Sequence, residues 1–500
     1  MTNTTEWITR SVSRLRSGAP STDKAPKASK PAADKPLADK QVADGAATKV
    51  PAPRSTHERL QATLRRGNES LSPRALRRLL ADLQDVVAPQ VSELEGGRRA
   101  QVVAAWYGQA EPEERRDMWL LLCEQFAPDA TRFQSARQRY EAAAGTADEG
   151  QAEISLRRAL VSPRTRLMQR FAVFPEGMRF LVDLRAELLP QLKSDKRLVA
   201  LDADLEHLFT TWFDVAFLEL RRLSWDSPAS LIEKLIKYEA VHDIRSWADL
   251  KNRLDSDRRC YGFFHPRLPN EPLIFVEVAL VDRISSSITP LLDEAAAPAD
   301  LKKATTAIFY SISNTQPGLR GVSFGDSLIK HVVETLTAEF PRLRTFATLS
   351  PIPGFRGWLG KNAGAMLERL DEKRRTELGR AAGAEPLQAT HLLAAADNAL
   401  ELDARSPVRQ MLMECAAYYL GRELQDGKPV DAVARFHLGN GARVERINWA
   451  GDPSAKGMKQ SFGLMVNYLY DLKRIDKHRN LLAQGKVPVS GDIDSLCRGG

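Results

Sequence analysis

A turn with three glycines, Gly318, Gly321 and Gly325, has the residue types that suit phosphate binding. It follows a strand-like run at residues 307–313 and precedes a helix-like run. Glycines let backbone amides approach a ligand without obstruction by a Cβ atom. The unpaired N–H groups and the partial positive charge at the start of a helix also attract an anion. We therefore predict a pyrophosphate-binding turn, to which Arg320 could add a direct charge contact.

Ser350 is a candidate for chemistry because of the backbone that surrounds it. It follows the strand-like run 345–349 and precedes Pro351 and Pro353, which would stiffen the mount of its hydroxyl. A serine that merely starts a Ser-Pro turn has the same context. A reactive hydroxyl and a turn residue are therefore both open interpretations.

His437 lies between Phe436 and Leu438 in the strand-like run 433–438. The pKa of an ordinary histidine lies near neutrality, which suits the donation of a proton to a developing anion. A single histidine on an apolar face is more often a core residue, and Tyr470 is open to the same two interpretations. These residues need a family context before they can be given a role.

The cysteines argue against a metal site or a disulfide framework. Cys123, Cys260, Cys415 and Cys497 lie far apart and form no CxxC pair. We expect the first three to be small core residues. This usage fits a reducing compartment, so we predict a cytoplasmic protein with no bound metal and no cofactor.

Charge and hydropathy exclude two classes of partner. The chain has 500 residues and a formal net charge of +8. Residues 1–54 hold much of that excess, so we expect no broad basic face and no nucleic acid partner. No run approaches the roughly 20 apolar residues that cross a bilayer, so no membrane partner is expected.

Composition and periodicity divide the chain into three parts. Residues 1–54 are rich in Ala, Pro, Lys and Asp, and we expect a disordered tail. Residues 55–205 have apolar residues at helical spacing and predict an all-helical bundle, with one helix starting at the N-cap Ser72 and Pro73. Residues 206–500 mix strand-like runs with helices.

Strands are expected in this third part at residues 260–264, 273–281, 306–313 and 345–349, with a helix at 326–340. We also expect a linking helix at 212–222, strands at 433–438 and 443–448, and a helix at 461–474.

The glycine turn resembles the acyl-CoA-binding turn of the Gcn5-related N-acetyltransferase fold, which reads Arg-Gly-x-Gly-x-Gly before a helix. Arg320, Gly321 and Gly325 match this pattern, and Ser323 replaces the middle glycine. Longer segments resemble the malonyl-CoA decarboxylase family, in the family's order and approximate spacing. They are residues 239–242, 258–261, 308–313, 350–355, 436–442, 446–449 and 463–468. The resemblance is close over roughly residues 205–480 and looser over the helical part.

The family resemblance implies an α+β protein. An N-terminal all-helical bundle at residues 55–205 would mediate homo-oligomerisation, as a dimer or tetramer. A Gcn5-related N-acetyltransferase-like α/β catalytic domain would occupy residues 206–500. The implied partners are malonyl-CoA as substrate and acetyl-CoA as product.

The same resemblance implies site residues. Ser350 and His437 fall on the family's catalytic pair, and Tyr470 falls on a tyrosine near the end of its catalytic domain. The animal members carry Glu where Ser323 stands, so no role of that carboxylate transfers to this chain. The implied CoA-binding residues are Arg320, Gly321, Val322, Ser323, Phe324, Gly325 and Asp326.

The implied reaction needs no cofactor because the thioester itself is the electron sink. Loss of carbon dioxide leaves a thioester enolate, and we expect His437 to protonate its carbon. An acyl-CoA-dependent N-acyltransferase on the same fold is one alternative. A non-catalytic acyl-CoA-binding protein, in which Ser350 and His437 only pack, is another.

Overall fold

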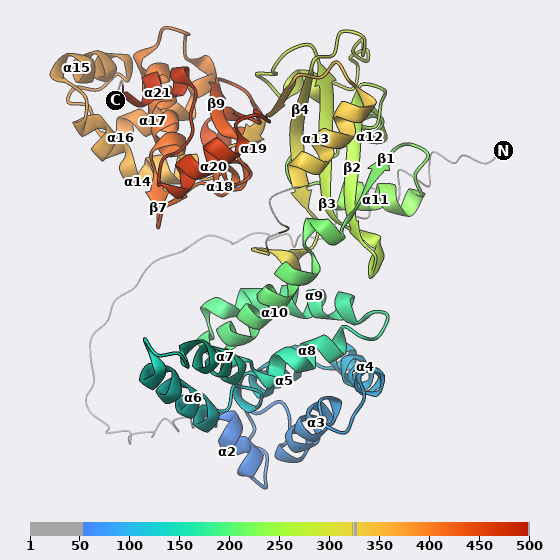
Figure 1. Cartoon of the computed structure of the whole chain (residues 1–500). Coiled ribbons are helices and arrows are strands. Elements are labelled where there is room, and N and C mark those ends of the chain that lie inside the picture. The colour runs from blue at the N-terminus through green and yellow to red at the C-terminus, as the bar shows by residue number, and fades with distance from the viewer. Residues whose placement is uncertain (1–53, 323, 325–327, 499–500) are drawn as a thin grey trace, which may run out of the picture. The chain divides into compact units, whose positions relative to one another are not determined.

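The computed structural model describes residues 54–322, 324 and 328–498 (Figure 1). The predicted tail up to residue 53 lies outside the described residues, as do Ser323, Gly325 and Asp326 of the predicted turn. The chain from Thr56 to Trp212 is helical, with short 3₁₀ turns at Leu189–Lys193 and Lys196–Leu198. Its helices are α2 (Thr56–Gln61), α3 (Pro73–Val86), α4 (Glu93–Gln109), α5 (Pro112–Gln125), α6 (Ala130–Ala143), α7 (Glu149–Leu160), α8 (Pro163–Phe171), α9 (Gly177–Leu188) and α10 (Val199–Trp212).

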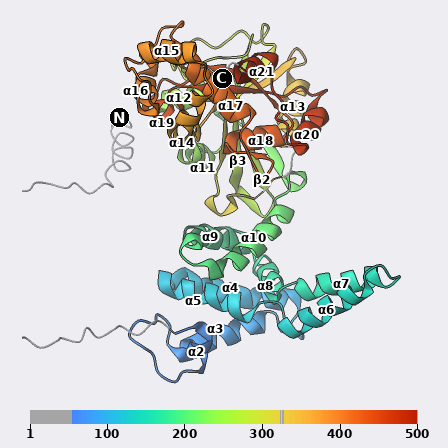
Figure 2. The same ribbon diagram turned by 90° about the vertical axis from the view of Figure 1, so that its left-hand side faces the viewer.

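Helix α3 shows why these segments fold as they do. The Ser72 hydroxyl accepts a hydrogen bond from the N–H of Ala75 at 3.2 Å, and Pro73 occupies the first turn, so the predicted N-cap is confirmed. Leu76 and Leu83 are buried on one face of the helix, as their spacing predicts. Helices α6 and α7 lie side by side as an antiparallel hairpin (Figure 2). Helix α10 continues through the predicted domain boundary at residue 205.

The described residues after Trp212 contain an eight-stranded sheet in the order β1-β2-β3-β4-β5-β10-β6, with β9 also paired to β10. Strands β1 to β4 are antiparallel neighbours, and β4 and β5 are parallel. The predicted α+β class is confirmed. The strands are β1 (Glu219–Leu223), β2 (Arg258–His265), β3 (Leu268–Val281), β4 (Thr306–Asn314), β5 (Thr345–Thr348), β6 (Ser350–Pro351), β9 (Arg443–Asn448) and β10 (Met465–Leu469).

Helices cover both faces of this sheet. Helix α13 (Leu328–Glu339) joins β4 to β5 and lies across the strands (Figure 1). Tyr261 and Phe263 of β2 join the same hydrophobic cluster as α13. Cys260, which alternation points to the other face, packs with α11 (Ala229–Tyr238) and α12 (Trp247–Arg253). The predicted core role of Cys260 is therefore confirmed.

The remaining helices follow β6 and surround the end of the sheet that β9 and β10 form. A small hairpin of β7 (Leu424–Gln425) and β8 (Lys428–Pro429) lies among them. These helices are α14 (Phe355–Glu368), α15 (Glu372–Ala381), α16 (Ala389–Asp397), α17 (Pro407–Gly421), α18 (Ala432–Gly439), α19 (Ala455–Ser461), α20 (Ile475–Ala483) and α21 (Gly491–Arg498).

Strands β4 and β5 separate after four residue pairs. Their ladder ends at Phe309 and Thr348, and the next strand, β6, pairs with β10 instead. At the same level Tyr310 is an extra residue of β4, because the register with β3 shifts between its two neighbours. The separation opens a space between the end of β4 and Ser350.

The linking helix predicted at residues 212–222 is wrong. Helix α10 ends at Trp212, and β1 starts at Glu219. Residues 219–223 pair antiparallel with β2 along their full length. Pairing with a sheet edge outweighs local helical preference there.

The predictions for residues 433–438 and 461–474 are also wrong. The first run is helix α18, because the Asp431 carboxylate caps it by accepting the N–H groups of Val433 and Ala434, both at 2.9 Å. In the second run, Phe462 and Gly463 take left-handed backbone angles, with φ of 54° and 77°. They end α19, and the chain continues as β10.

A buried charge cluster fixes α12 to the sheet. Arg253 donates to Asp249 on its own helix at 2.7 Å and to Glu277 of β3 at 3.1 Å. The Arg253 and Glu277 side chains are both fully buried. Burial, with the Glu239 carboxylate adding in the same direction, raises the pKa of Glu277 to about 8. At pH 7 Glu277 is therefore mostly protonated.

Glu277→Gln should change how stability depends on pH. The pKa of Glu277 is raised on folding, so its contribution to stability is complete below about pH 4.5 and is lost as pH rises towards 8. We expect the wild type to lose roughly 1 kcal/mol per pH unit relative to the variant in this window. Melting temperatures from pH 5 to 8 measure this. Parallel curves for Glu277→Gln would contradict the raised pKa.

Candidate active site

The structure brings Ser350, His437 and Tyr470 into one hydrogen-bonded chain. The Ser350 hydroxyl lies 3.3 Å from Nε2 of His437, and Nδ1 of His437 lies 2.8 Å from the Tyr470 hydroxyl. All three residues are buried. They come from three distant parts of the sequence, so only the fold places them together.

Each residue is held by a separate element. Ser350 stands on β6, where the pairing with Val466 of β10 fixes the backbone. His437 lies in the last turn of α18, and its ring stacks on Tyr468 with centroids 4.7 Å apart. Tyr470 follows β10, and its N–H bonds to the Phe346 carbonyl at 2.9 Å. The three side chains therefore meet between a strand, a helix and a strand end.

The hydrogen bond between Ser350 and Thr348 sets the direction of the other hydrogen bonds among these side chains. The Ser350 hydroxyl donates to the Thr348 hydroxyl oxygen at 2.8 Å, and that oxygen also accepts the N–H of Tyr468 at 3.1 Å. The single proton of Ser350 is thus committed, so the bond to His437 must run from Nε2–H to the Ser350 oxygen. Nδ1 then accepts the proton of the Tyr470 hydroxyl. This order assigns the Nε2–H tautomer to His437.

His437 is a neutral imidazole in this structure. Complete burial lowers the pKa of His437 to about 3, because the charged ring would lose its hydration. The near-neutral pKa expected from the sequence is therefore wrong for this side chain. Burial also raises the pKa of Tyr470 above its usual value, so the phenol keeps its proton. At pH 7 a proton donated by His437 or Tyr470 therefore comes from a neutral side chain.

Two adjoining cavities connect these residues to the glycine turn. A cavity of about 240 Å³ has Ser350 and His437 in its wall, in the space between β4 and β6. A second cavity, of about 510 Å³, has Val322 and Phe324 in its wall. Both cavities share three lining residues, which are Ile312, Asn314 and Phe436. A long, thin ligand could therefore reach from the turn to Ser350.

The described part of the turn is suited to a ligand. Arg320 and Gly321 are exposed, whereas Val322 and Phe324 are buried. Gly321 has a φ of 84°, which side-chain-bearing residues rarely adopt. A Cβ atom added there would meet no atom of the described residues within 4 Å, chain neighbours aside. The other predicted turn residues, Ser323, Gly325 and Asp326, lie outside the described residues.

The sequence interpretation missed the residues that support this site. Thr348 fixes the Ser350 hydroxyl, and its spacing of two along an extended chain is a signal that was available. Glu239 accepts hydrogen bonds from Ser311 and Ser313 of β4 at 2.7 and 3.1 Å, and Ser311 lines the smaller cavity. Glu239, Ser311 and Ser313 lie in segments that carry the family resemblance.

Arg446 and Asn448 lie in a segment that carries the family resemblance, and both have structural partners. Arg446 donates to Asn448 at 2.8 Å, and Asn448 donates to Asn467 at 2.9 Å. Asn467 in turn donates to the Thr348 carbonyl at 2.7 Å. This network holds the end of β5, two residues before Ser350. Asn440, by contrast, lines the larger cavity.

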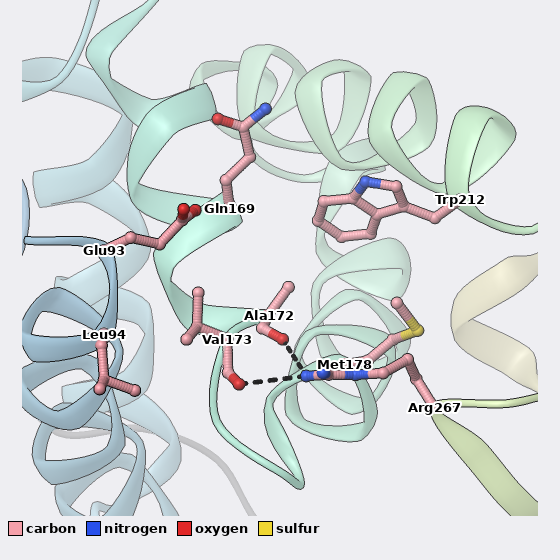
Figure 3. Close-up of a pocket in the computed structure, with 8 residues that line it drawn as sticks. All are labelled: Glu93, Leu94, Gln169, Ala172, Val173, Met178, Trp212 and Arg267. Atoms are coloured by element: carbon pink, nitrogen blue, oxygen red, sulfur yellow. Dashed lines mark hydrogen bonds between the residues drawn. The ribbon is translucent and has the colours of Figure 1, made fainter.

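A further cavity lies away from this site. It has a volume of about 760 Å³, and its lining includes no predicted site residue (Figure 3). Figure 3 shows Arg267, from the turn between β2 and β3, pointing at the carbonyls of Ala172 and Val173 beyond the end of α8. The described residues contain no cluster of three or more His, Cys, Asp or Glu side chains that could hold a metal ion.

Comparison with known proteins gives consistent matches. The family model of the malonyl-CoA decarboxylase C-terminal domain matches residues 216–499, and that of the N-terminal domain matches residues 126–213. The mitochondrial malonyl-CoA decarboxylase of Rattus norvegicus is 36% identical over 424 residues, which are 80% of this chain and 85% of that protein.

Solved structures agree with these matches. The crystal structure of malonyl-CoA decarboxylase from Rhodopseudomonas palustris is 40% identical, with a TM-score of 0.72, and the match covers 84% of this chain and 99% of that one. The corresponding structure from Cupriavidus metallidurans is 43% identical, with a TM-score of 0.68, over 85% and 100% of the two chains.

The buried neutral histidine should make the protein less stable in mild acid. The pKa of His437 is about 3 in the folded chain, so below about pH 6.5 only the unfolded chain gains this proton. We expect this to cost the wild type about 2 kcal/mol between pH 7 and pH 5. His437→Asn should show a smaller fall in melting temperature over this range. A fall as large in His437→Asn as in the wild type would show that His437 is charged in the folded protein.

Proposed function

The chain belongs to the malonyl-CoA decarboxylase family and is a carboxy-lyase acting on malonyl-CoA, and we propose that Ser350, His437 and Tyr470 carry out its chemistry. The observation that supports this assignment is their hydrogen-bonded chain, of which Ser350 and His437 line a cavity that adjoins the one beside Val322 and Phe324 of the glycine turn. The products are acetyl-CoA and carbon dioxide.

The two cavities suggest how the substrate lies. The CoA phosphates would bind at the turn, where Arg320 supplies charge and Gly321 an open backbone. The pantetheine arm would occupy the cavity beside Val322 and Phe324, and the malonyl group the smaller cavity beside Ser350. The described residues that line the smaller cavity include no Lys or Arg, so the carboxylate would have no ion-pair partner there. A carboxylate that no cation stabilises departs more readily as neutral carbon dioxide.

In the first step the bond between the α-carbon and the carboxylate carbon breaks. Its electron pair moves through the α-carbon onto the thioester carbonyl oxygen, which becomes an enolate oxygen, and carbon dioxide leaves. The Ser350 hydroxyl would turn from Thr348 to donate a hydrogen bond to this oxygen. A donor that meets charge developing in the transition state lowers the barrier.

In the second step the enolate is protonated at carbon. His437 would donate its Nε2 proton to the α-carbon, while Nδ1 takes the proton of the Tyr470 hydroxyl to which it is bonded. The imidazole therefore stays neutral, and Tyr470 is left as a phenolate that recovers a proton from water. A neutral imidazole is a weak acid, but the α-carbon of a thioester enolate is far more basic. The low pKa of His437 is compatible with this role.

We further propose a cytoplasmic homo-oligomer, a dimer or tetramer. The four cysteines are free thiols, which fits a reducing compartment. Ile154, Leu160 and Val161, in and just after α7, are exposed apolar side chains that a second copy could cover. Sedimentation of the purified chain measures the mass that tests this assembly. None of the described helices has the length and apolar character needed to cross a membrane.

Purified protein should release carbon dioxide and free acetyl-CoA from malonyl-CoA in a buffer that contains a metal chelator and no amine. The electron sink is the thioester, and the proton comes from the chain of side chains described above. Mass spectrometry of the CoA products with trapping of labelled carbon dioxide measures both. Transfer of the acyl group to an added amine would instead indicate an N-acyltransferase. Unchanged malonyl-CoA would indicate a binding protein.

Substitutions of Ser350, His437 and Tyr470 should show the contribution of each side chain to turnover. His437→Asn should lower kcat by about 10²–10⁴, because a general acid is lost, and should leave acetyl-CoA affinity within a few fold. Ser350→Ala should also lower kcat without changing acetyl-CoA affinity, because the thioester oxygen of acetyl-CoA carries no enolate charge for the hydroxyl to stabilise. Tyr470→Phe should have a smaller effect than His437→Asn, since it removes the second proton donor only. Steady-state kinetics and calorimetry give these values.

Two controls match the chemistry of the changed residues. His478→Asn and Ser461→Ala each remove a buried polar group that bonds a backbone carbonyl outside the cavities, and both should keep near-normal kcat. If Ser350→Ala is normal while His437→Asn is impaired, Ser350 is only a turn residue. If both have normal kcat, the assignment is wrong.

A further inference from the structure

One buried arginine of the helical part bonds directly to the backbone of the glycine turn. Arg185 of α9 donates through Nη1 to the carbonyl oxygens of Gly318 at 2.8 Å and Arg320 at 3.0 Å. Its Nε donates to the Asp202 carboxylate at 2.7 Å. The Arg185 side chain is 2% exposed. A charge is buried at this position only because these acceptors surround it.

Two further contacts hold the same segment against α9. A Cβ atom added to Gly318 would lie 1.8 Å from the Val182 carbonyl oxygen, so the turn and the helix touch with no room for a side chain. Arg179, one turn earlier on α9, donates to the Gln316 amide oxygen at 2.6 Å. The backbone of residues 316–320 is therefore fixed by a helix that lies more than a hundred residues earlier in the sequence.

The direction of these bonds matters for a ligand. A guanidinium that binds the carbonyl oxygens of Gly318 and Arg320 fixes the orientation of both peptide groups. The Arg320 side chain and the Gly321 backbone, next along the chain, remain exposed. An anion gains most from donors whose orientation is set before it binds, because no ordering cost is then added.

We propose that Arg185 is a positioning residue for the nucleotide end of the substrate, so that the helical part completes the CoA site rather than serving assembly alone. This inference rests on the proposed function, since it takes CoA as the ligand of the turn. Arg185 touches no substrate atom in this scheme. It acts on affinity through the turn, and it has no part in the chemistry at Ser350.

The chain contains a matched control. Arg164 of α8 is also a buried arginine, 3% exposed, that pairs with an aspartate, Asp204, and donates to three backbone carbonyls. Those carbonyls belong to Leu122, Cys123 and Ala200 of the helical part, not to the turn. Replacing Arg164 therefore repeats the structural damage of replacing Arg185 without reaching the CoA site.

The experiment compares two substrates in full-length Arg185→Met, Arg164→Met and wild type. Malonyl-CoA uses the turn, whereas the malonyl thioester of N-acetylcysteamine lacks the nucleotide and its phosphates. We expect Arg185→Met to raise KM for malonyl-CoA by roughly tenfold with kcat within about twofold, and to leave kcat/KM for the short thioester unchanged. Arg164→Met should leave the ratio of the two kcat/KM values at the wild-type level.

If folded Arg185→Met keeps the wild-type ratio of the two kcat/KM values, the inference is overturned. An equal loss of kcat/KM on both substrates is one way in which that ratio would stay unchanged. If that variant does not fold, Arg179→Met decides instead, because its side chain is partly exposed and bonds only one side chain of the turn. It should shift the ratio in the same direction, and a wild-type ratio would overturn the proposal. A failure of the proposed function looks different, since the wild type would then release no carbon dioxide from either thioester.

Discussion

The separation of β4 from β5 is the constraint on which the site depends. Parallel pairing stops at Phe309 and Thr348 because the next residues bond elsewhere: β6 pairs with β10, and the extra residue Tyr310 bends β4. A continued ladder would fill the space that Ser350 faces, and neither cavity could form. The other end of β10 pairs with β5, where Leu469 lies opposite Ala347 and the Tyr470 N–H bonds to Phe346. Strand β10 therefore fixes the backbone of Ser350 at one end and that of Tyr470 at the other.

Burial then determines what chemistry is possible in that space. A histidine at the surface would be partly charged near neutrality, but His437 lies under Tyr468 and Phe436 and is held neutral. Its protonated nitrogen is selected by hydrogen bonds, from Thr348 through Ser350 at one end and from Tyr470 at the other. The acid is thus a fixed tautomer rather than an equilibrium mixture. That arrangement suits a reaction whose basic atom is a carbon that appears only after carbon dioxide has left.

The sequence predicted the parts of the protein that local pattern controls. The N-cap at Ser72, the strands around Cys260 and Phe309, and the helix after the glycine turn follow from periodicity and caps. It failed where distant partners decide. Residues 219–223 look helical alone but form a sheet edge beside β2, and residues 465–469 become a strand only because three strands bond to them. Ser350, His437 and Tyr470 were found through the family resemblance, whereas the pKa of His437 depends on burial that no local pattern reports.

The glycine turn shows the same division between local and distant causes. Its glycines explain why the backbone can take this path, since Gly318 has no room for a Cβ atom and Gly321 has a positive φ. They do not explain what keeps the path fixed, because a segment rich in glycine loses more conformational freedom on ordering than other sequences. Arg185 and Arg179 supply the restraint from α9. Contacts from α9 therefore stabilise the conformation of the glycine turn, which belongs to the part of the chain that contains the sheet. A change that alters α9 should also alter the turn.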